Sequence, residues 1–168
     1  RLGGLLQLLG RPREAMRELE RARDLYAVAG NMPRVAYTVG TIGLVHAFLG
    51  EYDLALQCYL EQENVCRDVG DPGPLSHAMA FTGLLLYRRG DYAGALERLL
   101  PDVRVSRESG DPQQLASTLG TLALVYQEIE EFDTALEYSR ECESIGRSIG
   151  YRSIIAASIG NIGCMYTD

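Results

Sequence analysis

Residues 50–56 read G-E-Y-D-L-A-L, residues 90–96 read G-D-Y-A-G-A-L, and residues 130–136 read E-E-F-D-T-A-L. The three heptapeptides share one pattern and lie forty residues apart. The same interval separates two ladders of small residues, which are Gly30, Gly70, Gly110 and Gly150, and Ala15, Ala55, Ala95 and Ala135. A strict period of this length predicts a linear array of one supersecondary unit, and not a globule with a single enclosed core.

Hydrophobic spacing inside one period predicts a pair of helices. Within residues 31–70, apolar residues recur every three or four positions over 33–49, which indicates a first helix. A second helix is expected over about 52–69, and Gly70 supplies the left-handed residue that commonly ends a helix. The pair is therefore expected to form an antiparallel hairpin.

The period makes the whole chain, residues 1–168, one predicted domain, a single solenoid segment. Its parts are a partial unit 1–30, the units 31–70, 71–110 and 111–150, and a partial unit 151–168. We expect nine helices, of which the first is the tail of a helix at 1–9. The predicted fold class is all-α, an α-solenoid of antiparallel helix pairs. Because the chain opens and stops inside a repeat, we expect it to belong to a longer polypeptide.

Small residues recur at two positions of every first helix. One position holds Gly40, Ala80, Gly120 and Gly160, and the other, three residues later, holds Gly43, Gly83, Ala123 and Gly163. Glycine inside a helix costs about 0.5–1 kcal/mol relative to alanine. Its recurrence predicts that another helix backbone approaches closely at these positions.

One second helix carries an irregularity. Pro101 falls inside the second helix of the unit 71–110, where proline removes a backbone hydrogen bond and clashes with the preceding turn. We expect a kink after Leu100. The kink is either a tolerated bend on a convex helix, or it produces a bent repeat that re-aims the binding face or meets a partner domain.

Together, the small residues, the Gly-Asp/Glu-Tyr/Phe turns and the Ala-Leu pairs resemble the tetratricopeptide repeat (TPR). The forty-residue unit is similar to the extended subtype of this family, and the resemblance covers the whole chain. Two departures are the first unit, where Gly10-Arg11-Pro12 lacks the aromatic, and the positions of His46 and Leu86, which replace the usual tyrosine. The resemblance implies a right-handed superhelix with first helices on its concave side and second helices on its convex side.

The resemblance also implies a ligand site, because family members bind peptides along the groove face of their first helices. The corresponding positions in this sequence are Tyr37, Thr41, Leu44, Phe48, His77, Phe81, Leu84, Tyr87, Arg88, Ser117, Thr121, Leu124, Gln127, Glu128 and Asn161. Leucine recurs at 44, 84 and 124 while the neighbours vary, as a peptide-reading surface requires. The alternative is that these leucines fill the core.

The chemistry of the predicted groove excludes one familiar binding mode. A family clamp for C-terminal carboxylates uses Lys and Asn where this chain has Thr41, Phe81 and Thr121, so that clamp is not expected. Arg88 is expected to pair either with an acid of the ligand or with Glu128. Apolar anchors suit an extended or helical peptide better.

Composition and motif content narrow the function classes. A net charge of −7 and a pI of about 4.9 argue against nucleic-acid binding, and no apolar run approaches the roughly 18 residues of a membrane span. Neither metal-ligand spacing nor a catalytic motif occurs, so we expect no cofactor, no metal and no enzymatic activity. The cysteines are Cys58, Cys66, Cys142 and Cys164, and they are expected to be buried, reduced thiols of a cytoplasmic protein.

The sequence thus predicts a non-catalytic scaffold that binds a protein or peptide. It would be an interaction or regulatory segment of a larger bacterial signalling protein, whose other domains are further candidate partners. One alternative is a sensory receptor that binds a small signal molecule or signalling peptide and switches an attached effector. Another is an architectural module that self-associates through the exposed ends of the array.

Overall fold

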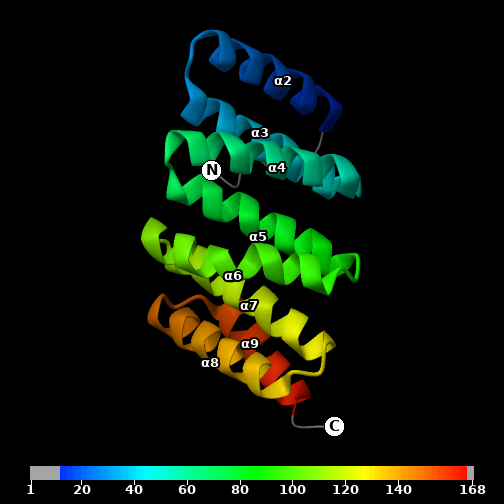
Figure 1. The fold of residues 1–168 in the computed structure, drawn as a ribbon, viewed down its shortest axis with the longest axis vertical. Helices are drawn as coiled ribbons and strands as arrows, with labels where there is room; N and C mark the ends of the chain where they lie inside the picture. Colours follow the sequence, from blue (N-terminus) through cyan, green and yellow to red (C-terminus); the bar gives the residue numbers. More distant parts are fainter. Residues whose placement is uncertain (1–11, 166–168) are drawn as a thin grey trace. The chain divides into compact units, whose positions relative to one another are not determined.

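A computed structural model describes residues 12–165 of the chain, and within that range it contains eight α-helices and no strand (Figure 1). The helices are α2 (Pro12–Val28), α3 (Met32–Phe48), α4 (Tyr52–Val69), α5 (Pro72–Arg88), α6 (Tyr92–Ser109), α7 (Pro112–Glu128), α8 (Phe132–Ser148) and α9 (Arg152–Cys164). Each of the three complete predicted repeats, 31–70, 71–110 and 111–150, contains two helices in order. The helix expected at 1–9 lies outside the described residues.

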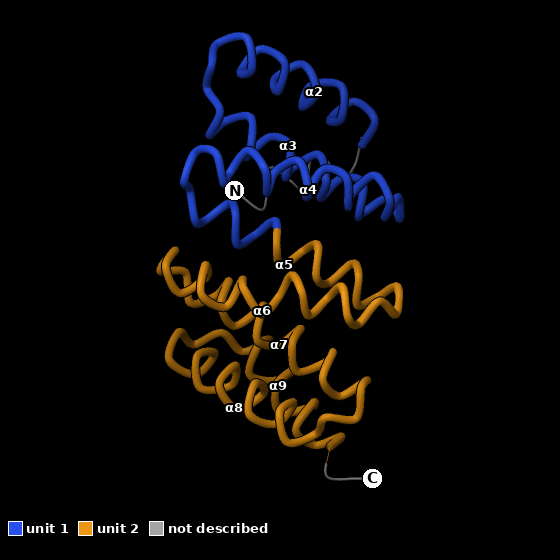
Figure 2. The backbone as a smooth tube through the Cα atoms, viewed as in Figure 1, with its two compact units in different colours: residues 1–78 blue, residues 79–168 orange. Residues whose placement is uncertain are grey.

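The chain divides into two compact units, residues 1–78 (unit 1) and 79–168 (unit 2), with the boundary inside α5 (Figure 2). In unit 1, α3 packs against both α2 and α4. In unit 2, α6 packs on α7, α7 on α8 and α8 on α9, and α7 also contacts α9. Consecutive packing of helix after helix gives each unit the all-α, α-solenoid architecture that the sequence predicts.

The turns follow the predicted punctuation. Gly70 ends α4 in the left-handed region, with φ 74°, and its N–H donates to the carbonyl of Cys66. Asp111 caps α7, because one side-chain oxygen accepts hydrogen bonds from the backbone N–H groups of Gln113 and Gln114 at 2.9 and 3.1 Å. Glu130 takes a positive φ of 63° at a position where other units have glycine. These local signals fix where each helix begins and ends.

Burial follows the forty-residue ladders. The four alanines of the second-helix ladder, Ala15, Ala55, Ala95 and Ala135, are all at most 4% exposed. In unit 2, Ala95 joins Leu99, Leu122 and Val125 in a fully buried cluster. The alanine ladder therefore marks the buried side of the second helices.

Gly40, Gly43 and Gly83 of the first helices face side chains, which corrects the prediction of a close backbone approach at these positions. A methyl group added at Gly83 would lie 2.5 Å from Cγ of Leu99, and one added at Gly43 would lie 3.1 Å from the Tyr59 ring. Glycine is thus required because a bulky side chain of the following helix packs directly on it.

Pro101 does not end α6, which continues through it as one helix and leaves the proline exposed. The kink after Leu100 remains a prediction. The next residue, Asp102, is completely buried and accepts a hydrogen bond from Thr118 Oγ1 of α7 at 2.7 Å. A buried carboxylate is tolerated there because α7 supplies a donor.

Two of the four cysteines are buried as predicted, namely Cys66 and Cys142, and Cys58 is half-buried. Burial raises the pKa of the Cys66 thiol to about 11. Cys164 corrects the prediction, because it is exposed on α9. None of the four, all of which lie within residues 12–165, forms a disulfide.

Candidate functional site

Two exposed aromatic side chains lie on α3. Tyr37 is 53% exposed and Phe48 is 60% exposed. They are eleven residues, or about 16 Å, apart along the helix. Thr41 and Leu44 lie between them and are half-buried. We call Tyr37, Thr41, Leu44 and Phe48, with Arg34 one turn before them, the α3 strip.

The opposite side of α3 belongs to the core of unit 1. Val35, Val39, Ile42 and Val45 are at most 5% exposed, and α2 and α4 pack against this helix. With its core side already filled, α3 presents Tyr37 and Phe48 to solvent. Large aromatic side chains in that position are more typical of binding surfaces than of solvated helix faces.

Arg34 extends the strip and was not among the predicted groove residues. It lies one turn before Tyr37, is exposed, and forms no ion pair among the described residues. Its three-residue spacing from Tyr37 places both on one helix face, so the sequence did contain the signal. The strip therefore combines aromatic groups with one available positive charge.

In unit 2 the predicted groove residues of α5, α7 and α9 differ in exposure. Arg88, Ser117 and Glu128 are exposed, and the half-buried members are Phe81, Leu84, Leu124, Gln127 and Asn161. Thr121 corrects the prediction, because it is only 8% exposed and its hydroxyl donates to the carbonyl of Ser117 at 3.0 Å. That hydroxyl is satisfied by its own helix.

Tyr87 was predicted to be a groove residue, and the structure instead packs it against the buried cluster of Ala95, Leu99, Leu122 and Val125. Its ring centroid lies 6.1 Å from that of Tyr92. Burial and the nearby Glu128 carboxylate raise the pKa of Tyr87. Tyr87 thus acts as a structural side chain at the junction of α5 and α6.

The expected pairing of Arg88 with Glu128 does not form. Glu128 instead accepts a hydrogen bond from the Tyr92 hydroxyl at 3.1 Å. Arg88 is exposed and makes no ion pair with the described residues. Its guanidinium is therefore available to an anionic group, which is the other expectation for this residue.

His77 also lies closer to the core than expected. It is half-buried, and its ring meets that of Tyr59 edge-on with centroids 6.2 Å apart. Burial lowers the pKa of His77, so the neutral imidazole is favoured. The second histidine, His46, is half-buried, with Nδ1 2.6 Å from a Glu51 carboxylate oxygen.

Charge is distributed unequally between the two kinds of helix. The first helices α3, α5, α7 and α9 together carry three arginines and one acid, Glu128. The second helices α2, α4, α6 and α8 carry ten arginines and fifteen acids. The protein's negative charge therefore resides mainly on second helices and turns, so an acidic partner would meet the least repulsion at the first helices.

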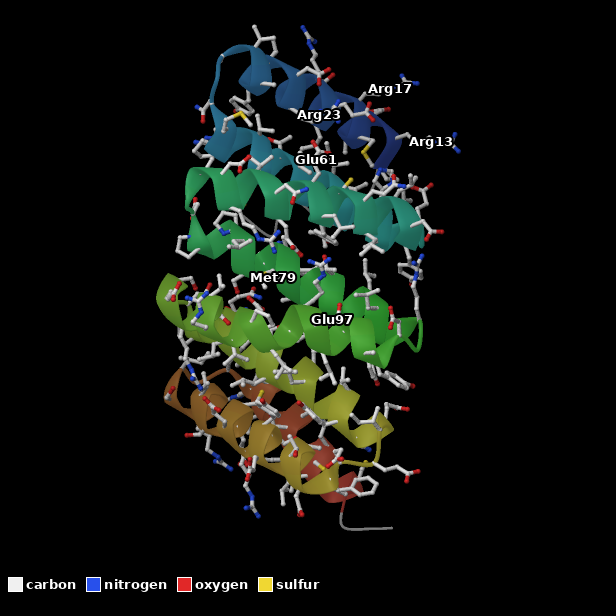
Figure 3. The ribbon with its side chains drawn as sticks, in the orientation of Figure 1. Arg13, Arg17, Arg23, Glu61, Met79 and Glu97 are labelled. Atoms are coloured by element: carbon white, nitrogen blue, oxygen red, sulfur yellow. The ribbon has the colours of Figure 1, made fainter. Side chains whose placement is uncertain are left out.

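Helix α2 carries four arginines, the most of any described helix, and four acidic residues. Figure 3 shows Arg13 and Arg17 projecting outward from the first half of α2. Further along, Arg23 lies beside Asp24, with Nη2 2.9 Å from its carboxylate. Exposed pairs of this kind contribute little to stability.

Neither a metal-binding cluster nor a membrane-spanning helix occurs in the part of the chain that the structure describes. Within residues 12–165, no cluster of three or more His, Cys, Asp or Glu side chains could hold a metal ion. No helix in the same range has the length and apolar character needed to cross a membrane.

Comparisons with known proteins agree with the fold. No protein-family model matches the chain, and no curated protein matches it. Among solved structures it is similar to the crystal structure of BtubC (BKLC) from P. vanneervenii, with a TM-score of 0.75 and 20% sequence identity. The similarity covers 96% of this chain and 65% of that one, so the chain spans just under two thirds of its length. At this identity the likeness shows the helical-repeat fold alone.

Proposed function

We propose that the chain is a non-catalytic, protein-binding scaffold that holds a segment of its partner against the exposed faces of its first helices. The observation that carries the proposal is the exposure of Tyr37 and Phe48 on one face of α3, whose opposite face is core. Aromatic residues of this kind supply much of the binding energy at protein interfaces. Arg34 adds a charged contact at one end of the strip.

The architecture supports a TPR-type assignment of the forty-residue subtype. The alanine ladder is buried, the helix pairs recur in register, and the turns carry the predicted glycines. Such repeats present an extended surface built from many short units. We place the scaffold in a larger, cytoplasmic regulatory or signalling protein, where the partner is another protein, a peptide or a neighbouring domain.

The test compares two double variants in partner capture from the source cell, followed by affinity measurement with the purified partner. Tyr37→Ala/Phe48→Ala removes both aromatic groups and leaves the core side of α3 intact. We expect at least about a tenfold loss of affinity, since aromatic anchors commonly contribute 2 kcal/mol or more.

The matched control is Leu25→Ala/Leu54→Ala, which removes two side chains that are 62% and 43% exposed on second helices. It should leave the affinity unchanged. Equal loss in both variants, or no loss in the first, would refute binding at the first helices.

A further inference from the structure

One face of α9 is exposed although the equivalent face of α3 is buried. The face consists of Ala156, Ile159, Gly160 and Gly163, all of them exposed. Their counterparts in α3, which are Ala36, Val39, Gly40 and Gly43, are all buried. Ile159 is 48% exposed, whereas Val39 and Leu119 at the same repeat position are 1% and 0% exposed.

The other repeats show which helix covers this face. In unit 1, the side chain of Gln62 on α4 lies against Gly40, and Tyr59 on α4 lies against Gly43. In unit 2, Leu99 on α6 lies against Gly83. In each case the covering element is the second helix of the same repeat. The exposed face of α9 is thus the next member of an interface that the chain already forms.

The residue at each position matches the size of the side chain that faces it. Gly43 faces the ring of Tyr59, and Gly83 faces Leu99, both of which are completely buried. At the same repeat positions of α7 and α8 the pair is Ala123 and Ser139, so a methyl group on the first helix accompanies a small residue on the second. Glycine at this position of the first helix therefore accompanies a bulky side chain on the second helix.

We propose that this face of α9 binds an amphipathic α-helix of the second-helix type. The helix carries a small residue and, four positions later, a tyrosine or leucine that packs on Gly163, as Ala55 with Tyr59 and Ala95 with Leu99 do elsewhere. The occupant follows from continuity with the α3–α4 interface and with the contact of Leu99 on Gly83. The site is on a different helix from the α3 strip, and the inference does not depend on the proposed function.

The first test uses a fluorescein-labelled peptide with the sequence of α4, residues 52–69, and measures its binding to the full chain by fluorescence anisotropy. We expect saturable binding of the unchanged peptide. The same peptide with Tyr59→Ser should bind at least about tenfold more weakly, because the space over Gly163 is then left empty. Equal affinity of the two peptides would overturn the size match.

A pair of variants locates the binding on α9. A methyl group added at Gly163 meets nothing within 4 Å, so Gly163→Leu should fold normally and abolish peptide binding. Ala157→Leu adds the same side chain to the same helix at the exposed repeat position of Tyr37 and should leave binding unchanged. Undiminished binding by Gly163→Leu would refute the site.

A covalent version covers the case of a short peptide that is too weakly helical to bind alone. Residue 168 has the repeat position of Phe48, so a copy of residues 49–70 joined after it continues the register. The extension should raise the urea midpoint, and Tyr59→Ser in the copied segment should remove most of the gain. An extension without effect on the midpoint would overturn the proposal. Self-association of the chain that is abolished by Gly163→Leu would also overturn it, because the occupant of the site would then be a second copy.

Discussion

Gly83 on α5 and Gly163 on α9 hold the same position in the repeat, and their surroundings differ. A methyl group at Gly83 would lie 2.5 Å from Leu99, whereas one at Gly163 would meet nothing within 4 Å. The comparison shows that a small residue in this array is one half of a pair. Its cost is offset only where a second helix places a large side chain over it.

The largest expected effect concerns Leu99, the large side chain that packs on Gly83. Leu99→Ala should destabilise the protein by about 2–5 kcal/mol, because it removes a completely buried side chain and leaves a cavity over Gly83. The measurement is the urea midpoint followed by circular dichroism. The matched change at the same repeat position, Ser139→Ala, should be nearly neutral, since its buried hydroxyl has no hydrogen-bond partner among the described residues. A small effect of Leu99→Ala would break the comparison.

Alanine at the two glycines should have opposite effects. Gly83→Ala should destabilise by about 1–3 kcal/mol, because the new methyl overlaps Leu99 near its branch point. Gly163→Ala should stabilise by about 0.5–1 kcal/mol, because only the helix propensity changes there. Both variants are compared with the parent chain in one urea titration. A shift of the same sign in both would show that their surroundings are not the deciding factor.

The turn between first and second helices offers a smaller test. Glu130 has a φ of 63° where Gly50 and Gly90 have 77° and 78°. Glu130→Gly should therefore stabilise by up to about 1 kcal/mol, the strain of a side chain in the left-handed region less the added freedom of the unfolded chain. Thermal unfolding provides the measurement, with Glu131→Gly at the neighbouring position as the control. Destabilisation by Glu130→Gly would indicate that its side chain matters more than its backbone.

The smallest expected effect is a pH dependence of stability that arises from His77. This residue holds in α5 the repeat position that Tyr37 holds in α3. Burial lowers the pKa of His77 below its usual 6.5, so the unfolded chain binds this proton more readily than the folded one. The resulting stability is present above about pH 6.5 and is lost as the pH falls toward the folded pKa.

Urea midpoints at about pH 7.5 and pH 5 measure this loss in the parent chain and in His77→Gln. The variant should lose less stability than the parent between the two pH values. An unchanged loss in His77→Gln would assign the pH dependence to other groups.

Much of the fold was predictable because its determinants are local. The forty-residue ladders predicted the order of the helices, and helix α4 begins and ends where the spacing of apolar residues and Gly70 indicated. The candidate site was predictable only in part. Tyr37 and Phe48 are exposed as expected, but Thr121 is buried and Tyr87 packs on the core.

The sequence by itself determined the period, the helix boundaries and the buried ladder, since hydrogen-bonding caps, left-handed turns and hydrophobic spacing act over a few residues. Only the tertiary structure decided whether a side chain of another helix packs on each small residue, and which side chain it is. That outcome depends on side chains brought together from different helices, such as Leu99 over Gly83, and Gly163 has the same residue type with nothing above it. One repeat position can therefore be core in one helix and surface in another.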